Sequence, residues 1–192
     1  MSKATFDLVI VGVGGQGTLL ASKILGRLAL SENCGVKVSE VHGMSQRGGS
    51  VITYVRVGDR VHSPVVGIGQ ADYLLSFEAL EAARASAFLK PDGVAIVNTQ
   101  EILPMPVITG AASYPASVLD AFAGREVLST DAMKIAVEAG SQKALNLVLL
   151  GMLSRRLPFS EQAWKEAIAA CVPKKTLPVN IAAFEKGRGQ AV

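Results

Sequence analysis

The sequence predicts an α/β fold: a Rossmann-like sheet with a hairpin insertion and a helical C-terminal third, in one domain spanning residues 1–192. Three observations lead to this prediction. An apolar run ends in a glycine-rich turn near the start of the chain. Short β-branched runs alternate with helical segments over about 5–128, and helical patterns alone fill about 129–187. A length of 192 residues suits one domain with a sizeable core.

The first predicted elements are a strand, a tight turn and a helix. The apolar run 6–12 has the composition of a strand buried on both faces, and the helix that follows covers about 15–31. A second strand is predicted at 36–41. The β-branched run 51–57 and the extended residues after it flank a Gly-Asp pair at 58–59, which predicts a hairpin at that pair.

The middle of the chain continues the alternation of strands and helices. Short buried strands are predicted at 74–77 and 94–97, on either side of an alanine-rich helix at 78–88. Residues 107–109 lie between prolines and are expected to form one more strand. After a Thr-Asp pair that can cap a helix, the predicted helices cover about 131–139, 142–154, 161–170 and 178–186.

Composition argues against several classes of function. The net charge is only +3 and no dense Lys/Arg block occurs, so no nucleic-acid partner is expected. No apolar run reaches the roughly 20 residues of a membrane helix, and the N-terminal residues have no signal-peptide pattern, so we expect a cytoplasmic protein without a membrane span. With only Cys34 and Cys171, this chain alone cannot ligate a four-iron cluster, and no metal site is expected.

Hydrophobic residues make up 49% of the chain, which is high for a free-standing protein with 18% charged residues. A parallel sheet buried on both faces accounts for such a surplus, and so does an apolar surface that a partner covers. We keep both interpretations, and we expect the isolated chain to be able to homo-oligomerise through such a surface.

The turn after the first strand is the first candidate site. Backbone N–H groups and the positive end of a helix dipole converge there, which suits a phosphate. The glycines have the G-x-G-x-x-G spacing of dinucleotide sites, and Glu40 lies where an acidic residue would hold the ribose of NAD(P). Two further interpretations stay open: a turn that only packs, and a contact with a neighbouring chain. The candidate residues of the turn are Gly12, Gly14, Gly15, Gln16 and Gly17.

The loop 42–50 is the second candidate site. Arg47 could hold a carboxylate or phosphate through two parallel hydrogen bonds, or it could pair with a surface carboxylate. We expect strand 36–41 to lie beside the first strand, which would bring the loop to the edge where the glycine turn lies. His42 is expected to be structural. The candidate residues of the loop are Gln46, Arg47, Gly48 and Gly49.

Groups that react are not recognisable in the sequence. There is no Ser/His/Asp set, no metal-ligand spacing and no pair of carboxylates in a plausible cleft, so no catalytic residue is predicted. The sequence therefore indicates one part of a catalyst whose chemistry lies on another chain.

Several segments together resemble a known family. GVGGQG at 12–17 is followed by EVHGMSQRGGS at 40–50, SP at 63–64, ADYLLSFE at 71–78 and ALNLVLLG at 144–151. These segments resemble the gamma-type subunit of 2-oxoacid:ferredoxin oxidoreductases, and within that family most closely the small (beta) subunit of the indolepyruvate enzymes. The resemblance extends from about residue 5 to about residue 185.

The resemblance implies a function and its partners. The holoenzyme would decarboxylate an aryl 2-oxoacid oxidatively, form the acyl-CoA and pass electrons to ferredoxin. Thiamine diphosphate and iron–sulfur clusters would belong to the large partner subunit, which agrees with the lack of a Gly-Asp-Gly thiamine motif and of cluster cysteines here. The resemblance also implies that this domain contributes to coenzyme A binding, with the 12–17 turn and Arg47 near its phosphates.

Overall fold

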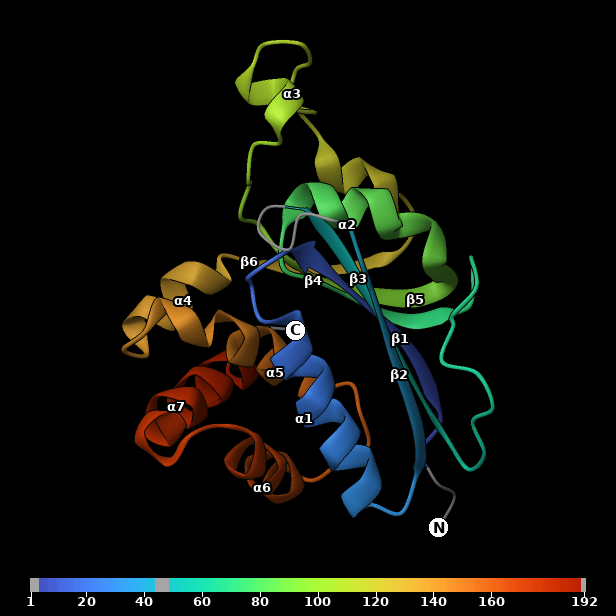
Figure 1. The fold of residues 1–192 in the computed structure, drawn as a ribbon, viewed down its shortest axis with the longest axis vertical. Helices are drawn as coiled ribbons and strands as arrows, with labels where there is room; N and C mark the ends of the chain where they lie inside the picture. Colours follow the sequence, from blue (N-terminus) through green and yellow to red (C-terminus); the bar gives the residue numbers. More distant parts are fainter. Residues whose placement is uncertain (1–3, 44–48, 191–192) are drawn as a thin grey trace.

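The structure is a computed structural model that describes residues 4–43 and 49–190. Among these residues, six strands form one mixed sheet in the order β2-β3-β1-β4-β5-β6 (Figure 1). Strands β1, β4, β5 and β6 are parallel, whereas β3 runs antiparallel to both of its neighbours, β1 and β2. The strands are β1 Phe6–Val13, β2 Gly35–His42, β3 Ser50–Gly58, β4 Ala71–Ser76, β5 Leu89–Asn98 and β6 Glu126–Thr130.

Helices cover both faces of the sheet, but unequally. Helix α1 and the C-terminal helices α4 to α7 lie on one face, and α2 lies on the other (Figure 1). The α-helices are α1 Thr18–Ser31, α2 Ala79–Ala85, α3 Met105–Ile108, α4 Ala132–Glu138, α5 Leu145–Ser154, α6 Glu161–Cys171 and α7 Leu177–Arg188. None of the helices in the described ranges combines the length and the apolar character needed to cross a membrane. The cytoplasmic location stays a prediction.

Strand β1 is the centre of the core, as its sequence predicts. Because side chains alternate along a strand, Leu8 and Ile10 face α1 and the C-terminal helices, while Val9 and Val11 face α2. All four side chains are at most 1% exposed. The run of consecutive apolar residues is therefore the pattern of a strand covered on both faces.

The predicted hairpin at 58–59 is wrong. The hairpin consists of β2 and β3, which pair from Gly35 opposite Gly58 to His42 opposite Val51, so the 42–50 segment closes it. Residues 59–70 form no strand. The physical reason is that β3 pairs with β2 along one edge and with β1 along the other, which leaves no free edge for a further strand.

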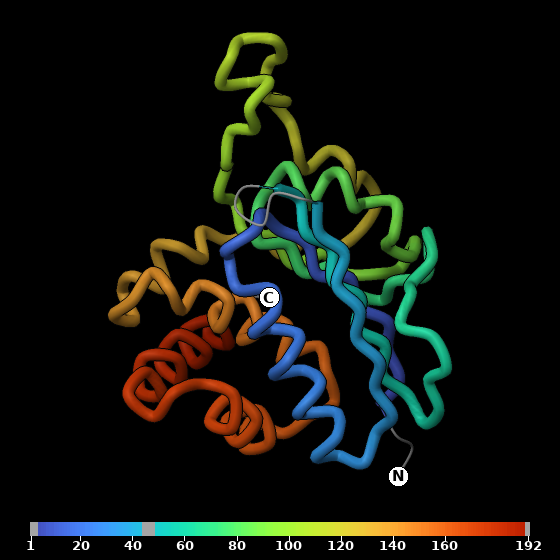
Figure 2. Tube along the Cα trace, viewed as in Figure 1, coloured from blue at the N-terminus to red at the C-terminus, as the bar shows by residue number. Residues whose placement is uncertain are grey.

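Two other local predictions also need correction. Residues 107–109 are not a strand: α3 begins after Pro104 and carries Pro106 in its first turn, a position that suits proline because a first-turn N–H has no intrahelical partner. Strand β6 was missed, because this five-residue edge strand mixes polar and apolar residues without a clear period. The chain between β5 and β6 leaves the body as an excursion that contains α3 (Figures 1 and 2).

Candidate functional site

The glycine turn connects the end of β1 to the start of α1, at the carboxyl edge of the parallel strands. Gly15 and Gly17 have φ of +99° and +90°, a conformation that side chains other than glycine rarely adopt. Gly17 is the N-cap of α1, and no side chain among the described residues caps this helix. Among the described residues the Thr18 and Leu19 N–H groups have no hydrogen-bond acceptor, whereas the Leu20 N–H donates to the Gly17 carbonyl at 3.1 Å. The two free N–H groups make this turn able to bind an anion.

The Gln16 side chain folds back and hydrogen-bonds the backbone at the turn. Its Oε1 accepts a hydrogen bond of 2.7 Å from the Val13 N–H, and its Nε2 donates to the Phe77 carbonyl at 3.0 Å and to Gln100 Oε1 at 3.3 Å. Gly12 makes room for this side chain, because a Cβ there would lie 2.8 Å from Gln16 Oε1 and 2.9 Å from Phe77 Cβ. In the structure both residues hold the turn in shape, and their role in ligand binding stays a prediction.

The two candidate loops meet, as predicted, at one edge of the sheet. The Gly14 N–H donates to the Gly49 carbonyl over 2.9 Å. The predicted route was wrong, because β2 is not beside β1: β3 lies between them and carries the second loop to the turn. Gln46, Arg47 and Gly48 lie outside the described residues, so their roles stay predictions.

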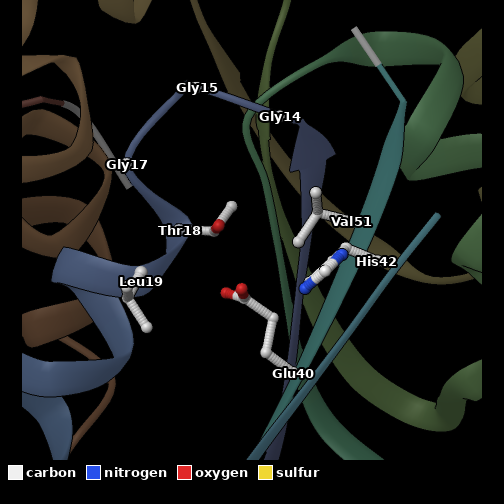
Figure 3. A pocket seen from close by; sticks show the side chains of 8 residues that line it. All are labelled: Gly14, Gly15, Gly17, Thr18, Leu19, Glu40, His42 and Val51. Atoms are coloured by element: carbon white, nitrogen blue, oxygen red, sulfur yellow. The ribbon is translucent and has the colours of Figure 1, made fainter. Parts of the chain in front are cut away.

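A first cavity opens on the β2 side of the turn, with a volume of about 390 Å³ (Figure 3). Figure 3 shows the Glu40 carboxylate, the His42 ring and the Thr18 hydroxyl directed into it, beside the glycines of the turn. Glu40 Oε2 accepts a hydrogen bond of 3.2 Å from the Thr53 hydroxyl, and His42 Nδ1 lies 3.1 Å from the Gly43 carbonyl oxygen. Glu40 is therefore near the turn, as the dinucleotide hypothesis predicted.

A second cavity, of about 450 Å³, opens on the other side of the same turn, towards the start of α5. Lys143 and Asn146 line it, and sequence reasoning named neither as a site residue. The signal was nevertheless present, because Asn146 lies inside the segment 144–151 that carries the family resemblance. The remaining lining residues are Gly15, Gln16, Gly17, Leu20, Gln100, Ile102, Met133, Gln142 and Leu145.

Buried carboxylates lie beside the turn on the α2 face. Glu78 is 1% exposed; its Oε1 accepts hydrogen bonds from the Ile102 N–H at 2.9 Å and from the Tyr114 hydroxyl at 3.2 Å. Burial, followed by the nearby negative charge of Glu78, raises the pKa of Tyr114 above its ordinary value. Glu78 thus holds the chain on both sides of α3, at Ile102 before it and at Tyr114 after it. Within the described ranges, no three His, Cys, Asp or Glu side chains group as metal ligands.

Comparisons with known proteins agree with this architecture. Residues 7–190 match the family described as pyruvate ferredoxin/flavodoxin oxidoreductase. The indolepyruvate oxidoreductase subunit IorB of Thermococcus kodakarensis is 45% identical over 189 residues, which cover 95% of this chain and 94% of the relative. The corresponding subunit of Archaeoglobus fulgidus is 39% identical over 97% of this chain and 95% of its own length. These relatives do not support the alternative of a stand-alone NAD(P)-binding oxidoreductase.

Solved structures share the fold. The gamma subunit of a keto/oxoacid ferredoxin oxidoreductase from Geobacter sulfurreducens has a TM-score of 0.71 at 24% identity, over 95% of both chains. The 2-oxoglutarate:ferredoxin oxidoreductase of Magnetococcus marinus, solved with 2-oxoglutarate, coenzyme A and succinyl-CoA, has a TM-score of 0.75 at 19% identity, over 97% of this chain and 31% of that longer one. With the family match over nearly its whole length, the chain belongs to the pyruvate ferredoxin/flavodoxin oxidoreductase family.

Proposed function

We propose that this small subunit of a 2-oxoacid ferredoxin oxidoreductase serves a complex that acts on an aryl pyruvate of the indolepyruvate type. The complex would decarboxylate the 2-oxoacid oxidatively to the acyl-CoA and reduce ferredoxin. The single observation that carries the substrate class is the 45% identity, over almost the full length of both chains, with an indolepyruvate oxidoreductase subunit. Pyruvate/ketoisovalerate relatives are more distant, at 26% identity for the common gamma subunit of Pyrococcus abyssi.

In this proposal the partner subunit holds thiamine diphosphate and the iron–sulfur clusters, and this chain contributes to coenzyme A binding. The glycine turn fits such a role: Gly17 caps α1 without a side-chain acceptor, and each side of the turn opens into a cavity. Coenzyme A supplies the thiol that accepts the acyl group. The residues that would hold its phosphates are the turn glycines Gly14, Gly15 and Gly17, together with Gln46, Arg47, Gly48 and Gly49 of the second loop.

Co-expression with a large indolepyruvate oxidoreductase subunit from the same organism tests the proposal. We expect one complex to purify, to reduce ferredoxin with indolepyruvate and coenzyme A, and to be much less active with pyruvate or 2-oxoglutarate. The purified small chain alone should be inactive. Turnover of a 2-oxoacid by the lone chain, or a preference for pyruvate over indolepyruvate in the complex, would contradict the proposal.

Arg47 provides a sharper test of the coenzyme A role. Loss of one charge-assisted hydrogen bond typically costs roughly 1.5–3 kcal/mol, so Arg47→Ala should raise the KM for coenzyme A about ten- to a hundred-fold. The KM for the 2-oxoacid should stay unchanged. Arg60→Ala is a matched control, since Arg60 is an exposed arginine at the opposite end of the sheet. Equal KM values for coenzyme A in the wild type and in Arg47→Ala would make Arg47 a structural residue.

A further inference from the structure

We propose that the glycine turn receives one of the phosphoryl groups of coenzyme A on its α5 side, in the second cavity, with Lys143 and Asn146 as the side-chain donors. The inference rests on the proposed function for the identity of the ligand, coenzyme A, and it deepens that function by choosing between two cavities. Neither residue was a candidate on sequence grounds.

The charges of the two cavities differ. Of the described residues that line the first cavity, Glu40 directs its carboxylate into it and His42 is the one basic side chain (Figure 3). The residues that line the second cavity include Lys143 and no Asp or Glu. A phosphoryl group carries negative charge, so it is repelled by the carboxylate in the first cavity and attracted by the ammonium group in the second.

Two helix N-termini meet at the second cavity. Gly15 and Gly17 bring the start of α1 to it, and Lys143 and Leu145 bring the start of α5. In α1, the N–H groups of Thr18 and Leu19 have no acceptor among the described residues. The start of α5 is extended by a 3₁₀ turn, Gln142–Ala144, in which the Lys143 N–H donates to the Ser141 hydroxyl at 3.3 Å, so α5 contributes its dipole and the Lys143 side chain rather than free N–H groups. Their dipoles add positive potential on the side where Lys143 lies.

Asn146 is an independent sign that a ligand belongs there. The residue is only 2% exposed, and its Oδ1 accepts a hydrogen bond of 3.0 Å from the Leu147 N–H. Its Nδ2 has no hydrogen-bond acceptor among the described residues, although it borders the cavity and lies 2.9 Å from where a Cβ on Gly17 would stand. The Nδ2 group is thus the donor that this otherwise buried residue presents to the cavity, and a phosphate oxygen there would accept its hydrogen bond.

The rest of the cavity suits the remainder of such a ligand. Gln100 uses its Oε1 to accept from Gln16, and its own Nε2 has no partner among the described residues. Ile102, Met133 and Leu145 provide apolar wall. Amide donors beside apolar surface match the amides and methyl groups of a pantetheine arm, which a phosphate anchor at Lys143 would position.

Isothermal titration of coenzyme A into the full chain, alone and in the complex with its large subunit, tests this inference. Lys143→Ala should weaken binding about tenfold, the equivalent of one charged contact. Asn146→Asp keeps the side-chain shape but replaces the donor by a negative charge, so it should weaken binding at least as much. Lys134→Ala is the matched control, because Lys134 is an exposed lysine on α4 outside the cavity.

The outcomes separate this inference from the proposed function. If coenzyme A binds the wild type, and Lys143→Ala and Asn146→Asp bind it equally well, the assignment to the second cavity is wrong while the coenzyme A role stands. Tighter binding by Glu40→Gln, with no effect of Lys143→Ala, would move the phosphate to the first cavity. No binding by either the chain or the complex would overturn both. Titration with dephospho-CoA, which lacks the 3′-phosphate, shows which phosphoryl group Lys143 contacts. If Lys143→Ala still weakens binding of dephospho-CoA, the contact is to the diphosphate; if it no longer does, the contact is to the 3′-phosphate. Both results support binding in the second cavity.

Discussion

Gly15 and Gly17 have nearly the same backbone conformation, with φ of +99° and +90°, but different surroundings. A Cβ on Gly15 would meet nothing within 4 Å. A Cβ on Gly17 would lie 2.9 Å from Nδ2 of the buried Asn146, so something would have to shift. The two positions therefore separate backbone strain from steric conflict.

We expect Gly15→Ala to lower the free energy of unfolding by about 1 kcal/mol, since only strain at positive φ is added. Gly17→Ala adds the conflict with Asn146 to the same strain and should lower it by about 2–3 kcal/mol. Urea unfolding of both variants beside the wild type measures the difference. Equal losses would mean that Asn146 moves away without cost.

Tyr114 makes the stability of the chain sensitive to alkaline pH. Its hydroxyl donates to Glu78 at 3.2 Å, and burial together with that carboxylate raises its pKa. The folded chain thus holds the phenol proton more tightly than the unfolded chain does. The resulting stability is fully present below the unfolded pKa of about 10 and is lost as the pH rises through the higher folded pKa.

Tyr114→Phe should therefore be less stable than the wild type near neutral pH. The difference in free energy of unfolding between the two proteins should narrow above about pH 10. The reason is that the wild type loses the contribution of Tyr114 there, whereas the variant has none to lose. Tyr73 also has a raised pKa and is present in both proteins, so its contribution cancels. Thermal unfolding from about pH 8 to about pH 11 measures this difference, and a constant difference would contradict this reasoning.

The sequence predicted the glycine turn and its meeting with the second loop, because glycine spacing and a strand–helix boundary are local signals. It could not assign roles within the turn. Gln16 is a candidate ligand-binding residue in the sequence, yet its amide is used by Val13 and Phe77, which lie at two neighbouring strand ends. Spacing along the chain does not point to Asn146, since it does not tell which later helix begins against the turn; the only signal was the family resemblance of segment 144–151.

Helices α5 and α7 approach each other so closely that only glycine fits at the crossing. A Cβ on Gly151 would lie 2.2 Å from the Phe184 carbonyl oxygen, and one on Gly187 would lie 2.1 Å from the Val148 carbonyl oxygen. Both neighbours are backbone atoms, which cannot turn aside as a flexible side chain can. The fit of the pair depends on these two positions.

Gly151→Ala should lower the free energy of unfolding by more than about 3 kcal/mol, because the two helices must separate to admit one methyl group. Gly26→Ala provides the matched control within a helix: Gly26 lies in α1 with nothing within 4 Å, so alanine should raise stability by up to about 1 kcal/mol. Thermal unfolding of both variants tests the pair. A mild effect of Gly151→Ala would show that the helices can slide apart.

At the scale of elements, the sequence predicted helices and buried strands well but not how the strands pair. Strands β1, β4 and β5 were found because continuous apolar runs indicate burial on both faces. The 58–59 hairpin failed because strand pairing depends on which edges are already occupied, and β1 had taken the second edge of β3. Strand β6 failed because an edge strand with polar residues has no periodic signal.

The whole molecule is organised around the sheet, with a separate apolar cluster on each face. The larger cluster joins β1 to α1 and to the C-terminal helices, and includes Trp164, which is fully buried with its ring 5.7 Å from that of Phe184. The smaller cluster lies under α2 and includes Leu74 of β4. Because both clusters share the same strands, we propose that the α/β part and the helical third unfold as one unit.

Leu74→Ala tests whether the two parts unfold together, because Leu74 lies on the face of the sheet opposite the C-terminal helices. Leu74 is fully buried, so its truncation should cost about 2–5 kcal/mol. The chain has one tryptophan, Trp164, which makes its fluorescence a specific probe of the C-terminal helices. If the sheet couples the two clusters, Leu74→Ala should shift the Trp164 fluorescence transition by the same free energy as the transition in circular dichroism.

Val137→Ala, at an exposed position on α4, is the control and should shift neither transition. A Trp164 transition that stays in place while the circular dichroism transition moves would show that the C-terminal helices unfold on their own, as a second domain.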